Sequence, residues 1–169
     1  MTPQPPSLRE IELRVATATD AGRLLDLTVQ LHDNADENAD DQFRYLYRTV
    51  FSQGVTADVC RVYVAHPTND PDRLVACGMA WVLQIMPAQW IPNGKMGYLQ
   101  GFYTEPAWRG RGAAGSIARS LIAWLELTGC SWAQLHSLPE VAPIYRKLGF
   151  GPGRYDNFWL RLPVADVAS

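Results

Sequence analysis

A glycine-rich turn that joins a predicted strand to a predicted helix restricts the fold of this chain more than any other feature. The β-rich segment 98–104 is stopped by Pro106, and the sequence Trp-Arg-Gly-Arg-Gly-Ala-Ala-Gly-Ser follows at positions 108–116. From about residue 114 to residue 128 apolar side chains recur at helical spacing, and Gly129 ends the pattern. A helix of this kind packs against the sheet that contains the strand, so the pattern predicts an α/β fold.

The start of that helix is suited to binding an anion. The first amide groups of a helix have no acceptor inside the helix, and the helix dipole favours negative charge there. Glycines let a phosphate approach the backbone closely, and Arg109 and Arg111 add charged donors. We therefore interpret the turn as a cradle for a pyrophosphate.

Two common nucleotide-binding folds fit this turn poorly. The chain lacks the Gly-Lys-Ser/Thr of a P-loop, which excludes that class. Gly110, Gly112 and Gly115 match G-x-G-x-x-G, but a Rossmann unit places an acid at the end of the next strand. Here that strand, 132–136, ends in His136 and Ser137. Binding of a dinucleotide in the Rossmann manner is therefore disfavoured.

The remaining periodicities predict a mixed sheet with helices. The order β-α-α-β-β-β-α-β-α-β combines antiparallel hairpin pairing in the first half with a parallel crossover in the second. This is an α/β (α+β) fold. The expected strands are 11–15, 61–65, 73–84, 98–104, 132–136 and 158–162, and the expected helices run from residue 20, from residue 40 or 41 to Gly54, from 114 to 128, and up to Gly149.

Composition narrows the class of protein. The length of 169 residues suits about one domain of ~150 residues, and we expect a proline-rich tail at 1–8 before a single domain at 9–169. A formal net charge of -2 argues against a nucleic-acid binder. No apolar run approaches the ~20 residues of a membrane span, and no signal peptide is evident. Three scattered cysteines predict neither a disulfide framework nor a metal site, so a cytoplasmic protein is expected.

The charges are distributed unevenly along the chain. Seven acids and one Lys or Arg lie between Asp20 and Phe43, whereas six bases and two acids lie between Trp108 and Arg154. This asymmetry fits a protein that holds a cation at one end and an anion at the other, and it equally fits two solvated faces. The acidic segment containing Asp33, Asp36 and Glu37 is a hypothetical attractor for a cationic amine.

Two motifs resemble those of the GNAT superfamily of N-acetyltransferases. Residues 103–114 resemble its motif A, an Arg/Gln-x-x-Gly-x-Gly/Ala turn that is met by Arg109, Gly112 and Ala114. Residues 144–150 resemble motif B, whose typical form is aromatic-x-Lys-x-Gly-Phe and which begins here at Tyr145. Residues 13–21 also resemble the family's first strand and helix start. The resemblance therefore extends over almost the whole chain.

The resemblance implies a site for acetyl-CoA. In this family the turn amides bind the coenzyme A pyrophosphate, and a bulged strand separates from its neighbour so that the sheet is splayed at its centre and admits the pantetheine arm. Gly101 lies where that bulge is expected, and Tyr145 at the position of the general acid. The implied cofactor-binding residues are Phe102, Tyr103, Thr104, Arg109, Gly110, Arg111, Gly112, Ala113, Ala114 and Gly115.

The base that deprotonates the amine is left open. His136, at the end of the strand flanking the slot, is the first candidate because a histidine side chain titrates in the right range, although a strand-end histidine can be purely structural. Glu105 is better suited to orient the turn, and a water relay needs no dedicated base. The chain also departs from the family at Leu138, where many members carry asparagine.

The resulting prediction is an N-acetyltransferase that moves an acetyl group to a primary amine by direct attack in a ternary complex. Its partners would be a small-molecule or peptide amine, with no nucleic acid and no membrane, and the resemblance also allows a homodimer. The alternative is a non-catalytic regulatory module that binds coenzyme A. Trp81 and Tyr47 are candidates for the floor of the amine pocket, with ordinary core packing as the other interpretation.

Overall fold

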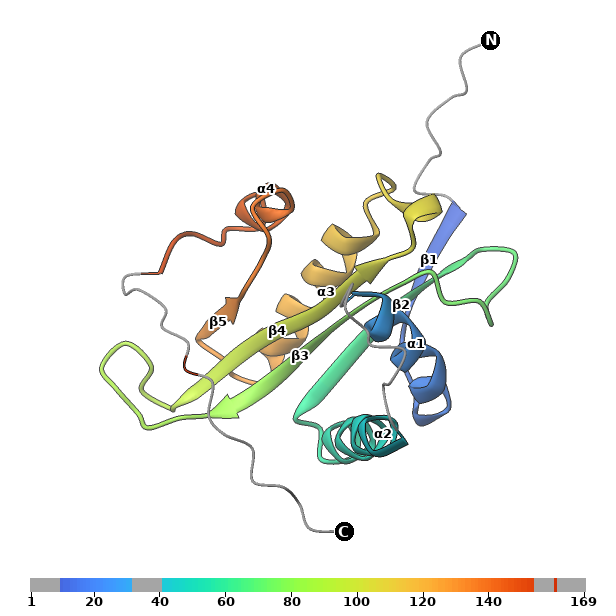
Figure 1. Cartoon of the computed structure of the whole chain (residues 1–169). Helices are drawn as coiled ribbons and strands as arrows, with labels where there is room; N and C mark the ends of the chain where they lie inside the picture. Colours follow the sequence, from blue (N-terminus) through green and yellow to red (C-terminus); the bar gives the residue numbers. More distant parts are fainter. Residues whose placement is uncertain (1–9, 32–40, 154–159, 161–169) are drawn as a thin grey trace.

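The computed structural model describes residues 10–31, 41–153 and 160, and its strands form one mixed sheet (Figure 1). Strands β1 to β4 are antiparallel neighbours in chain order, and β5 is parallel to β4. The predicted mixed α/β fold is confirmed. The elements are β1 (Ile11–Val15), η2 (Ala18–Asp20), α1 (Ala21–Leu31), α2 (Asp41–Thr56), β2 (Cys60–Pro67), β3 (Ala76–Gln84), β4 (Lys95–Thr104), η3 (Pro106–Trp108), α3 (Ala113–Leu127), β5 (Trp132–Leu135) and α4 (Ala142–Arg146).

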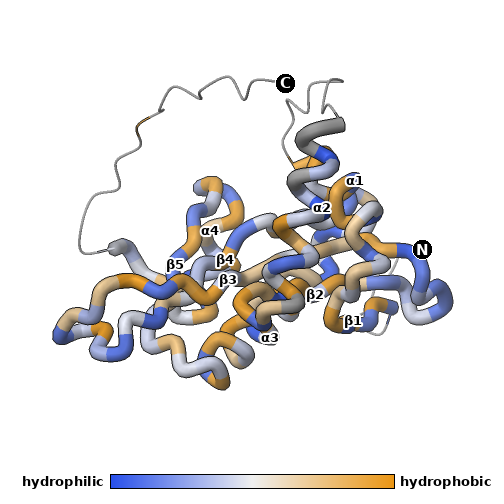
Figure 2. Tube along the Cα trace, turned by 90° about the horizontal axis from the view of Figure 1, so that it is seen from below, coloured by the Kyte–Doolittle hydropathy of each residue, from blue (hydrophilic) through white to orange (hydrophobic). Residues whose placement is uncertain are grey.

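Helices cover both faces of the sheet, α1 and α2 on one side and α3 on the other (Figure 2). Each face has its own apolar cluster. Ile117 and Leu121 of α3 pack with Leu99 of β4 in the first cluster, and Leu24 of α1 packs with Val62 of β2 in the second. The central strands are buried on both faces, which explains why β2 and β3 are almost continuously apolar.

Strand β4 contains the predicted bulge. Between the pairs Met79↔Gln100 and Cys77↔Tyr103, β3 advances by two residues and β4 by three, so β4 carries one extra residue. Gly101 within this step has a φ of 65°, in the left-handed region that favours glycine. The bulge turns the second half of β4 relative to its neighbours, just before the glycine-rich turn.

Pairing between β4 and β5 stops early. The register runs from Met96↔Trp132 to Leu99↔Leu135, where β5 ends, while β4 continues to Thr104. Beyond Leu99, β4 therefore pairs with β3 alone among the described strands. This unpaired edge of β4 lies where the slot is expected from the sequence, and we refer to the edge beyond Leu99 as the slot.

One expectation about the helices needs correction. Gly54 does not end α2, which continues to Thr56. Glycine is needed there for packing, since a Cβ on Gly54 would lie 2.5 Å from Cη2 of Trp81. The first helix, α1, begins at Ala21, next to the expected start at residue 20. The short η2 precedes it, with Thr17 as its N-cap, and the Thr17 amide donates to the Asp20 carboxylate at 2.8 Å.

Several expectations fall on parts of the chain that the structure does not describe. They are the tail at 1–8, the acidic segment with Asp33, Asp36 and Glu37, and most of the last strand at 158–162, of which Leu160 is described and is exposed. Across the described helices, none is both long enough and apolar enough to cross a membrane.

Candidate active site

The glycine-rich turn presents a row of unused backbone donors. Gly110 and Gly112 have φ values of 77° and 80°, and Gly112 is the N-cap of α3. The first amide of the helix start with a backbone acceptor is that of Ser116, which donates to the Gly112 carbonyl at 3.0 Å. The amides of residues 110–115 have no acceptor within the described part of the chain. The turn therefore has the donor set that an anion requires.

The space next to this turn is open enough for a phosphate. A Cβ built on Gly110 would meet no heavy atom within 4 Å, and one on Gly115 would meet only side-chain atoms, Ile144 Cγ2 at 3.8 Å and Arg119 Nη1 at 3.9 Å. The residues present thus fit a pyrophosphate group. The position of Ile144 also shows that α4 lies beside the first turn of α3.

Three arginines surround the turn and differ in what they can still bind. Arg109 is exposed, and its Nε donates to the Thr104 carbonyl at 3.0 Å. Arg119, which the sequence analysis missed, lies one helical turn beyond the cradle and donates to Ser116 Oγ at 3.0 Å. Its spacing of four residues from Gly115 was the signal that could have identified it. Arg111 instead pairs with Glu10 and lies over the Trp108 ring, at 4.3 Å from the ring centroid.

The predicted pantetheine-binding residues lie on the bulged half of β4. Phe102 points towards α3 and fills the space beside Gly78, where a Cβ would be 2.7 Å from the Phe102 ring. Tyr103 points to the opposite face, and its hydroxyl donates to Gln30 Oε1 of α1 at 2.9 Å. The structure brings these residues, with Thr104, to the strand edge that β5 leaves unpaired.

Tyr145 of α4 lies against this same strand. Its ring makes edge-to-face contacts with Phe102 and Phe150, with centroids 5.5 Å and 6.3 Å apart. The side chain is buried, and burial raises the pKa of Tyr145 to about 12. Its hydroxyl has no hydrogen-bond partner within the described residues and is not among their fully buried polar atoms. Tyr145 is thus a protonated donor with its proton unused.

His136 lies directly after β5, beyond the last β4–β5 pair. Its Nδ1 is 3.2 Å from the Tyr98 hydroxyl, and the two rings are in edge contact. The side chain is exposed. The structure therefore places His136 beyond the paired part of β5 and beside Tyr98 of β4, and its role as a base stays a prediction.

Glu105 is engaged in two ion pairs and is poorly placed to act as a base. Arg23 Nη2 lies 2.6 Å from one carboxylate oxygen and Arg73 Nη2 lies 3.2 Å from the other. The residue is also the N-cap of η3. This agrees with the expectation that Glu105 orients the turn.

Trp81 and Tyr47, the candidates for a pocket floor, pack against the cluster under α1 and α2. The Tyr47 hydroxyl lies 3.1 Å from Thr28 Oγ1, and the Trp81 ring covers Gly54. The indole N–H of Trp81 is buried and has no acceptor among the described residues. The structure assigns both side chains mainly to packing.

The two buried cysteines are unsuited to nucleophilic catalysis and should make the protein sensitive to alkali. Burial raises the pKa of Cys60 and of Cys77 from 9.0 to about 12. At a pH between 9.0 and about 12, these two thiols bind fewer protons in the unfolded chain than in the folded one. The free energy of unfolding should therefore fall as the pH rises through this window, by at most about 1.4 kcal/mol per pH unit for each thiol.

Urea unfolding measured from about pH 8 to about pH 11 tests this expectation. The variant Cys77→Ala should lose one thiol's share of the slope, whereas Cys130→Ala keeps both buried thiols and should match the unmodified protein. An unchanged slope in Cys77→Ala would contradict the assignment.

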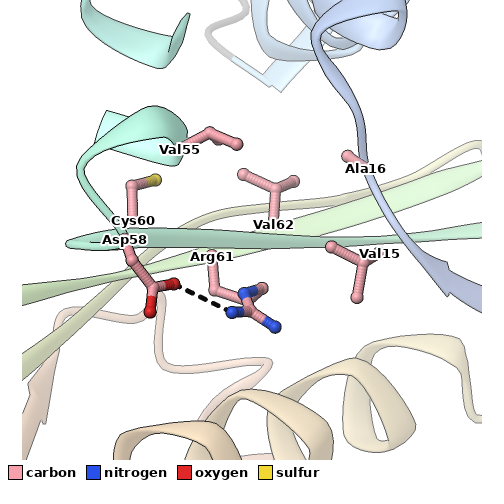
Figure 3. A pocket seen from close by; sticks show the side chains of 7 residues that line it. All are labelled: Val15, Ala16, Val55, Asp58, Cys60, Arg61 and Val62. Carbon is pink, nitrogen blue, oxygen red and sulfur yellow. Dashed lines mark hydrogen bonds and ion pairs between the residues drawn. The ribbon is translucent and has the colours of Figure 1, made fainter. Parts of the chain in front are cut away.

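Two cavities among the described residues lie outside the predicted site or at its edge. The first, of about 280 Å³, lies among the ends of β1 and α2 and the start of β2, and Asp58 and Arg61 form an ion pair at its rim (Figure 3). None of the predicted site residues lines it. The second, of about 390 Å³, is lined by Glu10, Thr68, Asn69 and Trp108, next to the glycine-rich turn. Among the described residues no group of three potential metal ligands occurs.

Comparison with solved structures identifies the fold. A predicted acetyltransferase from Clostridium acetobutylicum, solved with acetyl-CoA, has a TM-score of 0.76 at 23% identity, covering 90% of this chain and 96% of that one. Glucosamine-6-phosphate N-acetyltransferase from Arabidopsis thaliana gives 0.69 at 16%, covering 89% and 97%. The aminoglycoside N-acetyltransferase AAC(6')-Iy, in complex with a bisubstrate analogue, gives 0.71 at 17%, covering 90% and 99%.

Sequence comparison identifies the family. A search of curated proteins gave no match. The model of the Acetyltransferase (GNAT) family matches residues 25–150, which include both motifs, the bulged strand and the slot. This match spans most of the 169 residues. The chain therefore belongs to the GNAT family of acetyltransferases.

Proposed function

We propose that the protein is an N-acetyltransferase that uses acetyl-CoA and acetylates a primary amine by direct attack in a ternary complex. The observation that supports this proposal is that three groups without hydrogen-bond partners among the described residues lie near one another, since Ile144 of α4 is beside Gly115 and the Tyr145 ring is beside Phe102. They are the amides of 110–115, the free edge of β4 after Leu99, and the Tyr145 hydroxyl. Family membership supports acetyl transfer in general, and the amine acceptor and the mechanism are our inference.

The residues of the turn would hold the diphosphate of acetyl-CoA. The six amides of residues 110–115, at the positive end of the α3 dipole, would donate to the anion, and Arg109 and Arg119 would supply charge. Arg111 contributes its backbone amide to this set. The backbone of Phe102, Tyr103 and Thr104 would line the arm, and one of these amides can polarise the carbonyl to be attacked.

Acetyl-CoA supplies an activated acetyl group as a thioester. In the transfer a C–N bond forms and the C–S bond breaks, while one proton leaves nitrogen and one reaches sulfur. Tyr145 would act as the acid at the sulfur. Its pKa of about 12 keeps the phenol protonated at assay pH, so Tyr145 would hold the proton that passes to the sulfur as the C–S bond breaks, and solvent would then restore the proton on the phenol.

The amine must reach the slot uncharged. His136, beyond the paired part of β5, would accept its proton and pass it to solvent, with Tyr98 fixing the imidazole through the contact at Nδ1. The neighbours named above that act on glucosamine-6-phosphate and on aminoglycosides favour a small-molecule amine over a peptide.

A thiol-release assay with acetyl-CoA and a panel of amines tests this function. The panel contains polyamines, amino sugars, amino acids and a peptide with a free N-terminus. We expect at least one amine to accelerate thiol release and to yield a product heavier by one acetyl group in mass spectrometry. Binding of coenzyme A in calorimetry without turnover on any amine would favour the alternative, a non-catalytic regulatory module. Absence of binding would overturn both.

A further inference from the structure

The side chain of Arg111 is already occupied by protein groups. Its Nη1 donates to the Glu10 carboxylate, its Nη2 lies 3.4 Å from the Ala107 carbonyl, and its guanidinium covers the Trp108 ring. Its Nε is buried, so neither water nor a phosphate oxygen reaches that N–H in this conformation. Only 18% of the side chain is exposed. Arg111 is thus closed off from the open side of the turn.

Further ion pairs and a ring contact join this set through Trp108 and extend it to the residues that precede the turn. Arg73 also lies over the Trp108 ring, at 5.8 Å from its centroid, and pairs with Glu105, which in turn pairs with Arg23 of α1. Arg23 is fixed further by the Leu74 carbonyl, at 3.3 Å. We call this set the turn clamp; its members are Glu10, Arg23, Arg73, Glu105, Trp108 and Arg111.

The turn clamp ties the turn to distant parts of the chain. Glu10 immediately precedes β1, Arg23 belongs to α1, and Arg73 lies between β2 and β3. The turn itself, by contrast, contains two glycines with positive φ and six amides without an acceptor within the described residues. A backbone with so few hydrogen bonds of its own needs side chains to fix its direction.

We propose that Arg111 is a positioning residue. Held by Glu10 and Trp108, it fixes the direction of the turn amides and does not bind a phosphate through its guanidinium. This inference rests on the proposed function, since it concerns how the turn receives acetyl-CoA. It assigns the charged contacts with the anion to Arg109 and Arg119, whose guanidinium groups are exposed and retain unused N–H donors among the described residues.

The variant Glu10→Gln distinguishes a positioning role of Arg111 from a role as phosphate ligand, because the two roles predict opposite changes in coenzyme A affinity. If Glu10 and Arg111 act together on the turn, Glu10→Gln and Arg111→Gln should each weaken coenzyme A binding by about tenfold, and the double variant should be no weaker than the worse single one. If Arg111 were a phosphate ligand, Glu10→Gln would release it, and binding would tighten or stay unchanged. Calorimetry on the full chain distinguishes these outcomes.

Arg61→Gln is the matched control. Arg61 also pairs with an acid, Asp58 at 2.9 Å, and also lies over an indole, that of Trp124 at 5.1 Å. It should leave coenzyme A affinity unchanged. The melting temperatures of the single variants without ligand should stay close together, because each variant loses one ion pair whose acidic partner is exposed, Glu10 by 52% and Asp58 by 69%, and such pairs contribute little to stability. In turnover, the turn-clamp variants should raise KM for acetyl-CoA and leave kcat unchanged. A purely structural role would lower the melting temperature and the active fraction instead.

The outcomes also separate this inference from the proposed function. If the unmodified protein binds no coenzyme A, the proposed function and the role of Arg111 both fail. If it binds, and Glu10→Gln binds equally or more tightly, only the positioning role is overturned. The same conclusion holds if the effects of Glu10→Gln and Arg111→Gln are fully additive.

Discussion

Replacing Tyr145 with phenylalanine should lower kcat by about 10²-fold, because it removes one proton donor at the departing sulfur and leaves the ring in place. The contacts of the ring with Phe102 and Phe150 involve no hydroxyl group, and the hydroxyl has no partner among the described residues. The melting temperature and the affinity for coenzyme A should therefore match those of the unmodified protein. Steady-state thiol release with saturating amine measures the loss.

Tyr63→Phe is the control for this variant. Tyr63 belongs to β2, which β3 separates from β4, and it packs against the cluster under α3, so losing its hydroxyl should leave kcat unchanged. A Tyr145→Phe protein with full activity would remove Tyr145 from the mechanism. A protein that has lost coenzyme A affinity as well would point to a role in binding rather than in proton donation.

Gly112→Val should weaken coenzyme A binding by about 10²-fold, the equivalent of about 2.7 kcal/mol. At a φ of 80° a β-branched residue is strained by about 1–2 kcal/mol, and the backbone relieves this strain by rotating the amides that follow it. Those amides are the donors proposed for the diphosphate. Isothermal titration with coenzyme A measures the change.

Gly129→Val provides a control of the same kind at the opposite end of α3. Gly129 has a φ of 84°, and a Cβ there would lie 3.9 Å from Asn93 Nδ2, so the substitution carries a similar backbone strain without a clash. Both variants should lose a similar amount of stability, and only Gly112→Val should lose affinity. Equal affinities in the two variants would show that the diphosphate does not depend on the turn.

The sequence predicted the parts of the site that depend on local backbone chemistry. The glycine-rich turn, the bulge at Gly101 and the helix after Gly112 each follow from residues with a particular conformational preference, and the structure confirms them. The parallel pairing of β4 with β5 could also be predicted, because a strand–helix–strand crossover requires parallel strands.

Other features depend on contacts between distant segments and leave no local signal. The partner of Arg111 is Glu10, about a hundred residues earlier in the chain, and spacing alone cannot reveal such a pair. Gly54 was interpreted as a helix end because glycine often has that role, whereas here it makes room for the Trp81 ring. Helical periodicity places Arg119 one turn after Gly115, but periodicity alone does not show that its guanidinium donates to Ser116 beside the turn.

Phe102 occupies the volume that a methyl group on residue 78 would need, since a Cβ on Gly78 would come within 2.7 Å of its ring. The side chains at positions 78 and 102 cannot both be larger than they are, so a substitution at one position limits the size of the side chain that fits at the other. Because the same ring supports Tyr145, the placement of a phenol on α4 depends on the smallness of a residue in the middle of β3. Attempts to widen the slot for longer acyl chains would therefore begin with this pair, at 78 and 102, before any residue that faces the thioester.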